Sequence, residues 1–265
     1  MPVNIGGFAR NFRVDGPDGK PWLVLSNSLA ADLSMWDPQA ERLAARFRVL
    51  RYDTRGHGLS ETPPGPYELR DLVQDVVDLL DHVGIERASF MGLSLGGMTG
   101  LGLALDHPAR VERLICCDAR ADAPEAYVKG WTDRIAMVAK SGTQAIATAT
   151  VERWLSARTR AARPELVRRL EEMIAATSDV GYMGCAGALQ RLDYRSRLPS
   201  IACPTLFIVG ALDGATPPEV MADMAERVPR AKFSIVPEAA HISNLDNIPD
   251  FDAVADAFLD ATVQA

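Results

Sequence analysis

One serine of this chain, which has a glycine on each side two residues away, lies in a sequence pattern typical of a catalytic nucleophile. Residues 92–96 read Gly-Leu-Ser-Leu-Gly, which fits the G-x-S-x-G pattern around Ser94. The pattern lies between an apolar, strand-like run at 88–91 and a helical stretch that reaches about His107. At such a junction the motif forms a sharp turn that exposes the serine hydroxyl, and the helix directs its N-terminal amides toward developing negative charge. Ser94 is therefore the predicted nucleophile.

A serine hydroxyl is a weak nucleophile and needs a general base to accept its proton. The chain has four histidines. We expect the base to be His241, because it follows the last predicted strand, and reactive groups gather at the carboxyl ends of parallel strands. His57 also follows a strand and is the alternative base, whereas His82 and His107 lie within a helix or at its end.

The imidazole of such a base needs an acceptor that fixes its tautomer and stabilises its charged form. Asp213 is the expected acceptor, because it follows a predicted strand at 204–209. Thr216 and the two prolines after it predict a helix N-cap close by. Asp118, at the end of a predicted strand at 111–117, is the rival acid. Both carboxylates follow strands, so the alternative stays open at this point.

Acyl transfer also requires hydrogen-bond donors for the oxyanion of the tetrahedral intermediate. One donor is expected to be the backbone amide of Leu95, directly after the nucleophile. The second is expected from the loop after a predicted strand at 22–25, where residues 27–28 read Asn-Ser. The amide of Leu29 is the candidate, because Leu29 follows that pair.

Short apolar runs alternate with helical patterns in the first half of the chain and again near its end. Nearly continuous apolar strands separated by helices are typical of a parallel sheet with helices on both faces. The predicted fold class is therefore α/β, with a mostly parallel central sheet. The predicted strands are residues 22–25, 47–52, 88–91, 111–117, 204–209 and 232–236, and the flanking helices are 67–82, the stretch from the Ser94 turn to about 107, and 249–259.

Only helical patterns occur between about residue 121 and residue 198. They cover residues 124–140, 143–156, 164–176 and 179–192, and apolar residues at helical spacing give them one apolar face. The segment has no Gly/Ser-rich or Pro-rich stretch, so it is not a linker. We expect a core made of residues 1–120 and 199–265, with residues 121–198 inserted as a helical cap, or lid.

The composition excludes several classes of protein. Apolar residues make up 48% of the 265 residues, and 28 Lys+Arg against 35 Asp+Glu give a net charge of −7. An acidic chain without a basic run is a poor binder of nucleic acid or an anionic membrane. The chain has no apolar run of about 18 residues and no signal-like N-terminus, so we expect a cytoplasmic protein with reduced cysteines. No Cys/His spacing suggests a metal, and the predicted chemistry needs no cofactor.

These motifs identify a resemblance to the α/β-hydrolase superfamily and, within it, to the 3-oxoadipate enol-lactonases. The resemblance covers nearly the whole chain, and the Asn-Ser pair at 27–28, in place of the more common His-Gly, is its most specific feature. The order Ser94, Asp213, His241 is the chain order of α/β-hydrolase triads. The similar segments are 25–29, 35–39, 51–58 and 92–100, together with 131–135, 152–154 and 181–185 in the expected cap.

Two segments depart from the family pattern. Residues 118–120 read Asp-Ala-Arg, where the family usually has an Asn-Thr-Ala type of segment. Residues 189–191 read Leu-Gln-Arg, where Ile-Arg-Asp is frequent. Both departures fall near the expected acyl pocket and leave the three triad positions unchanged.

The resemblance implies hydrolysis of a small lactone or carboxylic ester through an acyl-enzyme, with 3-oxoadipate enol-lactone or a related lactone as substrate. It also implies that Arg134 binds a substrate carboxylate. Ser28 and Trp131 are the other candidate substrate contacts, with a place in the core as the alternative for Trp131. The alternatives are a small-ester carboxylesterase, a C–C hydrolase or cofactor-free perhydrolase on the same triad, and a non-enzymatic ligand receptor with a hydrolase fold. The expected partner is this small-molecule substrate, and neither nucleic acid nor a membrane is expected as a partner.

Overall fold

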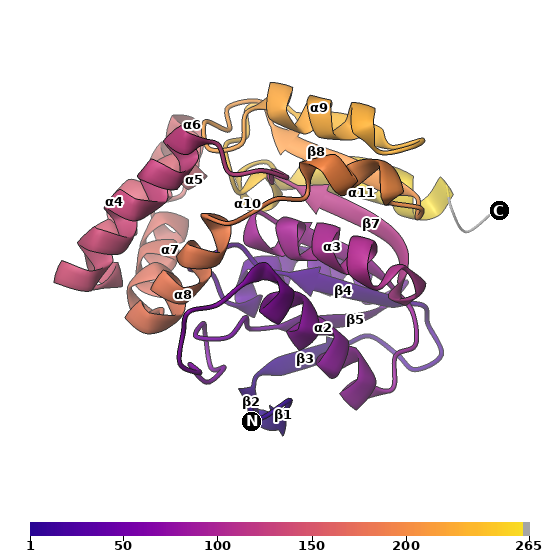
Figure 1. The fold of residues 1–265 in the computed structure, drawn as a ribbon. Helices are drawn as coiled ribbons and strands as arrows, with labels where there is room; N and C mark the ends of the chain where they lie inside the picture. The colour runs from indigo at the N-terminus through magenta and orange to yellow at the C-terminus, as the bar shows by residue number, and fades with distance from the viewer. Residues whose placement is uncertain (262–265) are drawn as a thin grey trace.

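The computed structural model describes residues 1–261, which form nine strands and eleven α-helices (Figure 1). The strands are β1 (Val3–Ile5), β2 (Phe8–Arg10), β3 (Phe12–Asp15), β4 (Trp22–Ser26), β5 (Arg48–Tyr52), β6 (Ala88–Leu93), β7 (Val111–Cys117), β8 (Thr205–Gly210) and β9 (Lys232–Val236). The α-helices are α1 (Asp37–Leu43), α2 (Leu69–Val83), α3 (Leu95–Asp106), α4 (Glu125–Ser141), α5 (Ala147–Trp154), α6 (Ala157–Ala162), α7 (Pro164–Ala176), α8 (Asp179–Leu189), α9 (Pro218–Arg227), α10 (Ser243–Asp246) and α11 (Ile248–Ala261). Short 3-10 helices lie at Leu33–Trp36, Pro108–Arg110, Thr143–Ile146 and Arg195–Ser200.

One seven-stranded sheet, in the order β3-β5-β4-β6-β7-β8-β9, forms the centre of the molecule. All neighbours from β5 to β9 pair in parallel, and only the edge strand β3 is antiparallel to its neighbour. The predicted α/β class with a mostly parallel sheet is confirmed. All six predicted strands are present, because β6 and β8 are buried over their whole length and β4, β5 and β7 nearly so, which gives continuous apolar runs.

Strands β1 to β3 were not predicted. Each is only three or four residues long, and each contains a polar or charged residue that interrupts the apolar pattern. Strands β1 and β2 pair only with each other, outside the main sheet. Their pairing depends on contacts made elsewhere in the fold, so the local pattern does not reveal them.

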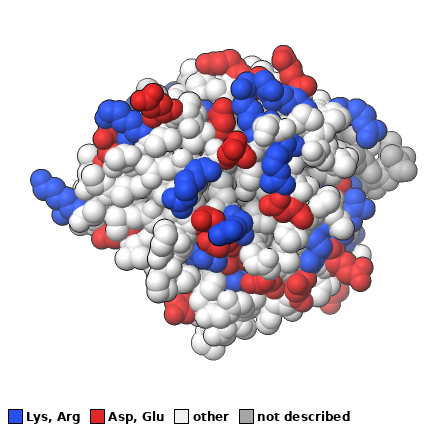
Figure 2. Space-filling model, viewed as in Figure 1, with Lys and Arg blue, Asp and Glu red and all other residues white. Residues whose placement is uncertain are grey.

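Helices cover the sheet on both faces. In Figure 1, α2 and α3 lie side by side in front of it, and α11 lies behind it. Helix α1 joins α11 through Arg42, whose Nε donates to Asp252 at 2.8 Å. Among the described residues, no helix is both long enough and apolar enough to cross a membrane. Positive and negative side chains are interspersed on the face shown in Figure 2.

After β7 the chain leaves the sheet and forms α4 to α8 in succession before it returns at β8. In Figure 1 these five helices lie together beyond one end of the sheet. The predicted helix over 143–156 is wrong in its bounds. It divides into a 3-10 helix at Thr143–Ile146 and α5, and Ser156 then caps the separate helix α6 by accepting a hydrogen bond from the amide of Thr159.

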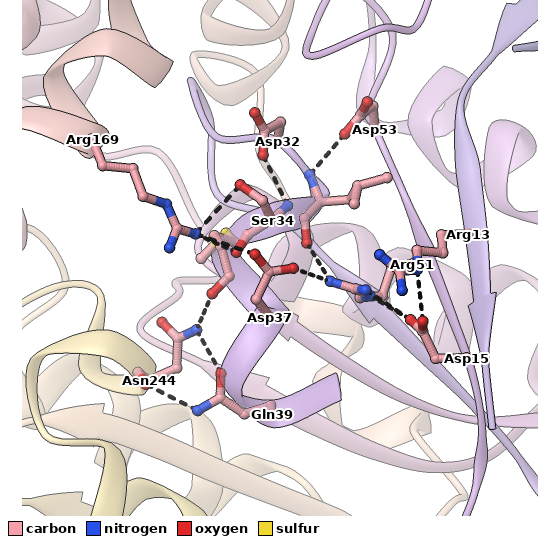
Figure 3. A network of polar contacts seen from close by, with 12 residues as sticks. Arg13, Asp15, Asp32, Ser34, Asp37, Gln39, Arg51, Asp53, Arg169 and Asn244 are labelled. Carbon is pink, nitrogen blue, oxygen red and sulfur yellow. Dashed lines mark hydrogen bonds and ion pairs between the residues drawn. The ribbon is translucent and has the colours of Figure 1, made fainter. Parts of the chain in front are cut away.

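A network of polar contacts holds the segment after β4, as Figure 3 shows. The amide of Leu33 donates to Asp53 at 2.7 Å, and Arg51 on β5 donates to Asp37 at 2.6 Å. Arg169 on α7 donates to the carbonyl of Ser34 at 2.6 Å. The segment that contains Leu29 is therefore fixed from the sheet on one side and from the α4–α8 helices on the other.

The turn between β6 and α3 requires its two glycines. Ser94 has φ 56° and ψ −114°, a conformation that few non-glycine residues adopt. A Cβ on Gly92 would lie 2.2 Å from the carbonyl oxygen of Gly96, and a Cβ on Gly96 would lie 2.2 Å from that of Ser26. Both contacts are to backbone, which cannot move aside without disturbing the sheet.

Replacing Gly96 by alanine is expected to lower the free energy of unfolding by about 1–3 kcal/mol, because the added methyl group overpacks a backbone contact. Gly130→Ala is the matched control, since a Cβ on Gly130 in α4 would meet nothing within 4 Å. That control should be neutral or gain about 0.5–1 kcal/mol from helix propensity. Urea unfolding measures both, and equal stabilities of the two variants would contradict the steric account.

Candidate active site

The elbow after β6 places Ser94 at the carboxyl end of the sheet. The amide of Ser94 donates to the carbonyl of Cys117 at the end of β7, at 2.8 Å. The amide of Gly96 donates to the carbonyl of Asn27 after β4, at 2.9 Å. The elbow is thus held between the ends of the two neighbouring strands, and the Ser94 side chain lines a cavity above them.

The structure brings Ser94, His241 and Asp213 together, although they come from three different strand ends. His241 Nε2 lies 3.0 Å from the hydroxyl oxygen of Ser94, and His241 Nδ1 lies 2.8 Å from Oδ2 of Asp213. Because the carboxylate can only accept from the ring, Nδ1 carries the proton and Nε2 is left to accept from the serine hydroxyl. This is the alignment that general-base activation of a serine requires.

Asp213 is held in place by its own turn. Its Oδ1 accepts from the amides of Ala215 and Thr216, at 2.8 and 3.1 Å, and its Oδ2 accepts from the Thr216 hydroxyl at 2.5 Å. The predicted helix N-cap at Thr216 is wrong. Helix α9 begins at Pro218 with Pro217 as its N-cap residue, because the Thr216 hydroxyl donates to Asp213 instead.

The charges of this pair support one another. Burial by itself raises the pKa of Asp213, but the charge and the hydrogen bond of His241, together with hydrogen bonds from Thr216, outweigh burial and lower that pKa below its usual value. Burial likewise lowers the pKa of His241, but the charge and hydrogen bond of Asp213 outweigh it and raise the pKa above its usual value. Both shifts favour an imidazolium–carboxylate pair.

The alternative base, His57, makes none of these contacts. Its Nδ1 lies 3.0 Å from the carbonyl oxygen of Arg55, and its ring does not line the cavity that contains Ser94. Burial lowers the pKa of His57 to about 4. The rival acid, Asp118, makes its hydrogen bonds to Gly210 and Ser243 rather than to His241.

Two backbone amides near the serine hydroxyl are available as donors. Within residues 1–261, neither the amide of Leu29 nor that of Leu95 donates to another residue. Leu95 begins α3, so its amide is one of the unsatisfied donors at the helix N-terminus. The amide of Ser28 donates to the sulfur of Met35 at 3.3 Å, so the amide of the next residue, Leu29, rather than that of Ser28, is available in that loop.

A cavity of about 440 Å³ lies above the serine. Ser94 and His241 line it from the strand ends, and Ser28 and Leu29 line it from the segment after β4. The remaining wall comes largely from the α4–α8 helices. All three residues expected to contact a substrate line this cavity, and the wall also includes residues that were not predicted as contacts: Arg120, Tyr127, Arg153, Trp154 and Tyr182.

Two guanidinium groups in the cavity wall have no acidic partner among the described residues. The Arg134 guanidinium stacks over the Trp131 ring at 4.7 Å, and Arg153 donates to the Thr150 hydroxyl at 3.1 Å. Burial and the nearby charge of Arg134 lower the pKa of Arg153. In contrast, Arg120 is paired with Asp122. The cavity therefore has an excess of positive charge that an anionic ligand would neutralise.

Arg153 and Tyr182 were overlooked as site residues although the segments that contain them, 152–154 and 181–185, support the family resemblance. A helical pattern shows which residues share a face but not which cavity that face meets. No cluster of three or more His, Cys, Asp or Glu side chains suited to a metal ion occurs in residues 1–261.

Comparison with known proteins gives the class of this chain. A family model described as the alpha/beta hydrolase fold matches residues 21–248. The chain therefore belongs to the α/β-hydrolases, as the elbow and the sheet order indicate.

Individual relatives extend this assignment. The chain is 36% identical to 3-oxoadipate enol-lactonase 2 of Acinetobacter baylyi, over 95% of this chain and 93% of that protein. It is 33% identical to a putative carbamate hydrolase RutD of a Caulobacter species, over 83% of both chains. The crystal structure of the enol-lactonase from Burkholderia xenovorans LB400 superimposes with a TM-score of 0.93 at 38% identity, covering 98% of this chain and 99% of that one. The predicted resemblance to 3-oxoadipate enol-lactonases is confirmed.

The two buried histidines are expected to titrate far apart. His241 should be protonated with a pKa above its usual value of about 6.5, whereas His57 should stay neutral down to about pH 4. NMR titration of isotopically labelled histidines measures both. Asp213→Asn should lower the pKa of His241, since it removes the charge that favours the imidazolium, and should leave His57 unchanged. An unchanged His241 in that variant would contradict the assigned coupling.

Proposed function

We propose that this protein hydrolyses a small lactone or carboxylic ester through an acyl-enzyme on Ser94. The proposal rests above all on the continuous hydrogen-bonded chain from Asp213 through His241 to Ser94 at the base of a ligand-sized cavity. The two unpartnered amides beside the serine support it further, because they are the donors that a tetrahedral oxyanion needs.

In the first half of the reaction, the Ser94 oxygen attacks the substrate carbonyl while His241 Nε2 accepts the hydroxyl proton. Asp213 holds the imidazole and stabilises the imidazolium. The amides of Leu29 and Leu95 donate to the oxyanion. When the intermediate collapses, His241 gives the proton to the leaving oxygen, or passes it through a solvent molecule to the carbon of the leaving enolate.

In the second half, a water molecule attacks the acyl carbonyl and gives its proton to His241. The second tetrahedral intermediate uses the same two amides. Its collapse breaks the bond to Ser94 and returns the proton to the serine oxygen. Every proton that leaves the serine or the water is thus accounted for by one imidazole, and these steps require no further group.

The substrate class that fits the cavity best is a lactone with a carboxylate, such as 3-oxoadipate enol-lactone. Arg134 has no acidic partner and stacks on Trp131 in the cavity wall, where it can bind a substrate carboxylate. Relatives named as 3-oxoadipate enol-lactonases support this choice. Ser28 faces the same cavity, and its hydroxyl makes no hydrogen bond within the described residues, so it can also contact the substrate.

We also propose that residues 121–198 act as a cap over the site. Helices α4, α5 and α8 supply Trp131, Arg134, Trp154 and Tyr182 to the cavity wall, while the sheet supplies the reacting side chains. This division gives substrate selection to the cap and bond cleavage to the core.

Ser94→Ala is expected to lower turnover of a p-nitrophenyl ester or a small lactone by at least about 10³-fold with the fold retained, because no other group in the site can form the acyl-enzyme. Circular dichroism and thermal unfolding serve as the fold control. A variant that keeps more than a few per cent of the activity would refute the assignment.

Arg134→Ala is expected to reduce kcat/KM on a carboxylated lactone by about 10- to 100-fold, since it removes a charged hydrogen-bond donor. A neutral ester of similar size should be affected only slightly. The matched control is Arg168→Ala, because Arg168 on α7 is exposed and does not line the cavity. Equal losses on the two substrates would argue against carboxylate recognition and favour a general small-ester carboxylesterase.

A further inference from the structure

A second buried carboxylate lies beside the site, and the proposed reaction does not use it. Asp118 follows β7 directly and has an exposed fraction of 0%. Its backbone has φ 47°, in the left-handed region that non-glycine residues rarely occupy. Burial of a carboxylate and a left-handed backbone are both unfavourable locally, so the contacts of Asp118 must compensate for them.

Those contacts lead to the segments that carry the acid and the base. Oδ1 of Asp118 accepts from the amide of Gly210 at 2.8 Å, three residues before Asp213. Oδ2 accepts from the hydroxyl of Ser243 at 2.5 Å, two residues after His241. One carboxylate thus joins the end of β8 to the start of α10.

The nucleophile is attached to the same point of the fold. The carbonyl of Cys117, the residue before Asp118, accepts from the amide of Ser94 at 2.8 Å. The amide of Asp118 in turn donates to the carbonyl of Ile208 on β8 at 2.8 Å. The end of β7 therefore makes direct hydrogen bonds to the nucleophile and to the strand that leads to Asp213.

When it is ionised, Asp118 also acts on the imidazole through its charge. The charged groups that influence His241 are Asp213 after β8, Asp118 after β7 and Arg134 on α4. The first two favour the imidazolium, and Arg134 opposes it. Asp118 itself is surrounded by Asp213, His241 and the thiols of Cys116 and Cys117. Burial and the charge of Asp213 raise the pKa of Asp118 well above its usual value, whereas the charge of His241 and the two hydrogen bonds that the carboxylate accepts oppose that rise. An anion at Asp118 is therefore most favourable when His241 is positively charged, which is the state that proton transfer creates.

We propose that Asp118 is a positioning residue of this site, whose carboxylate fixes the segments carrying Asp213 and His241 and whose charge supports the imidazolium. This inference rests on the proposed function, because it assigns Asp118 a role in the same acyl transfer. It differs from the rival-acid interpretation, since Asp118 acts through Ser243 and Gly210 rather than by contact with the imidazole.

Asp118→Asn separates charge from shape. The amide oxygen can still accept from Gly210, and the amide nitrogen can donate to the oxygen of Ser243, so both connections are kept while the charge is lost. Loss of a nearby anion destabilises the imidazolium, so the pKa of His241 should fall. The acidic limb of the kcat/KM profile is expected to move to lower pH by about 0.5 unit or more. The KM should stay within about twofold of the parent value, because Asp118 does not line the cavity.

Asp118→Ala and Ser243→Ala test the connections. Asp118→Ala removes both and should lower kcat by about tenfold or more through misalignment of the base. Ser243→Ala removes one and should give a smaller loss of kcat. The asparagine variant should have most of the kcat that the alanine variant loses. The acidic limb of its pH profile should nevertheless stay shifted to lower pH. A purely structural role of Asp118 would not produce this combination.

NMR titration of His241 in Asp118→Asn gives a readout that does not depend on activity. A lowered pKa of His241 supports the inference even if Ser94→Ala were to refute the proposed reaction. If Asp118→Asn leaves both the His241 titration and the pH limb unchanged, or if a folded Asp118→Ala variant keeps the parent kcat, the inference is overturned. Should the alanine variant not fold, the asparagine and Ser243→Ala variants decide the question.

Discussion

The hydrogen bond between His241 and Asp213 is the interaction on which the arrangement of the site depends. It orients an imidazole that is buried and therefore cannot be held by solvent, and it leaves Nε2 free to face the Ser94 hydroxyl. The carboxylate can remain ionised there because the turn of Ala215 and Thr216 supplies it with further donors. A buried charge without such donors would be neutralised or expelled.

The parallel sheet is what brings these groups together. Parallel strands end at the same edge, so the segments after β6, β8 and β9 meet there even though Ser94 and His241 are 147 residues apart in the chain. The hydrogen bonds of Asp118 reinforce this meeting point from β7. The site is therefore supported by the strand ends of the sheet, while the α4–α8 helices supply much of the cavity wall above it.

The charge distribution shows why the mean composition says little about the ligand. The chain carries a net charge of −7, yet the cavity presents Arg134 and Arg153 without acidic partners among the described residues. Stacking on Trp131 keeps the Arg134 guanidinium in the wall of the cavity. Local arrangement thus overrides net charge, because electrostatic interactions weaken with distance and with screening by salt.

The amino-acid sequence by itself determined the central strands and the elbow, because continuous apolar runs and the Gly-x-Ser-x-Gly spacing are local signals. It also narrowed the base and the acid to pairs of candidates. Only the tertiary structure shows that His241, and not His57, contacts Ser94. It likewise shows that Asp213, and not Asp118, contacts the imidazole. Such choices, like the short strands β1–β3 and the position of Arg153 in the cavity wall, depend on contacts between distant segments, and no local pattern encodes them.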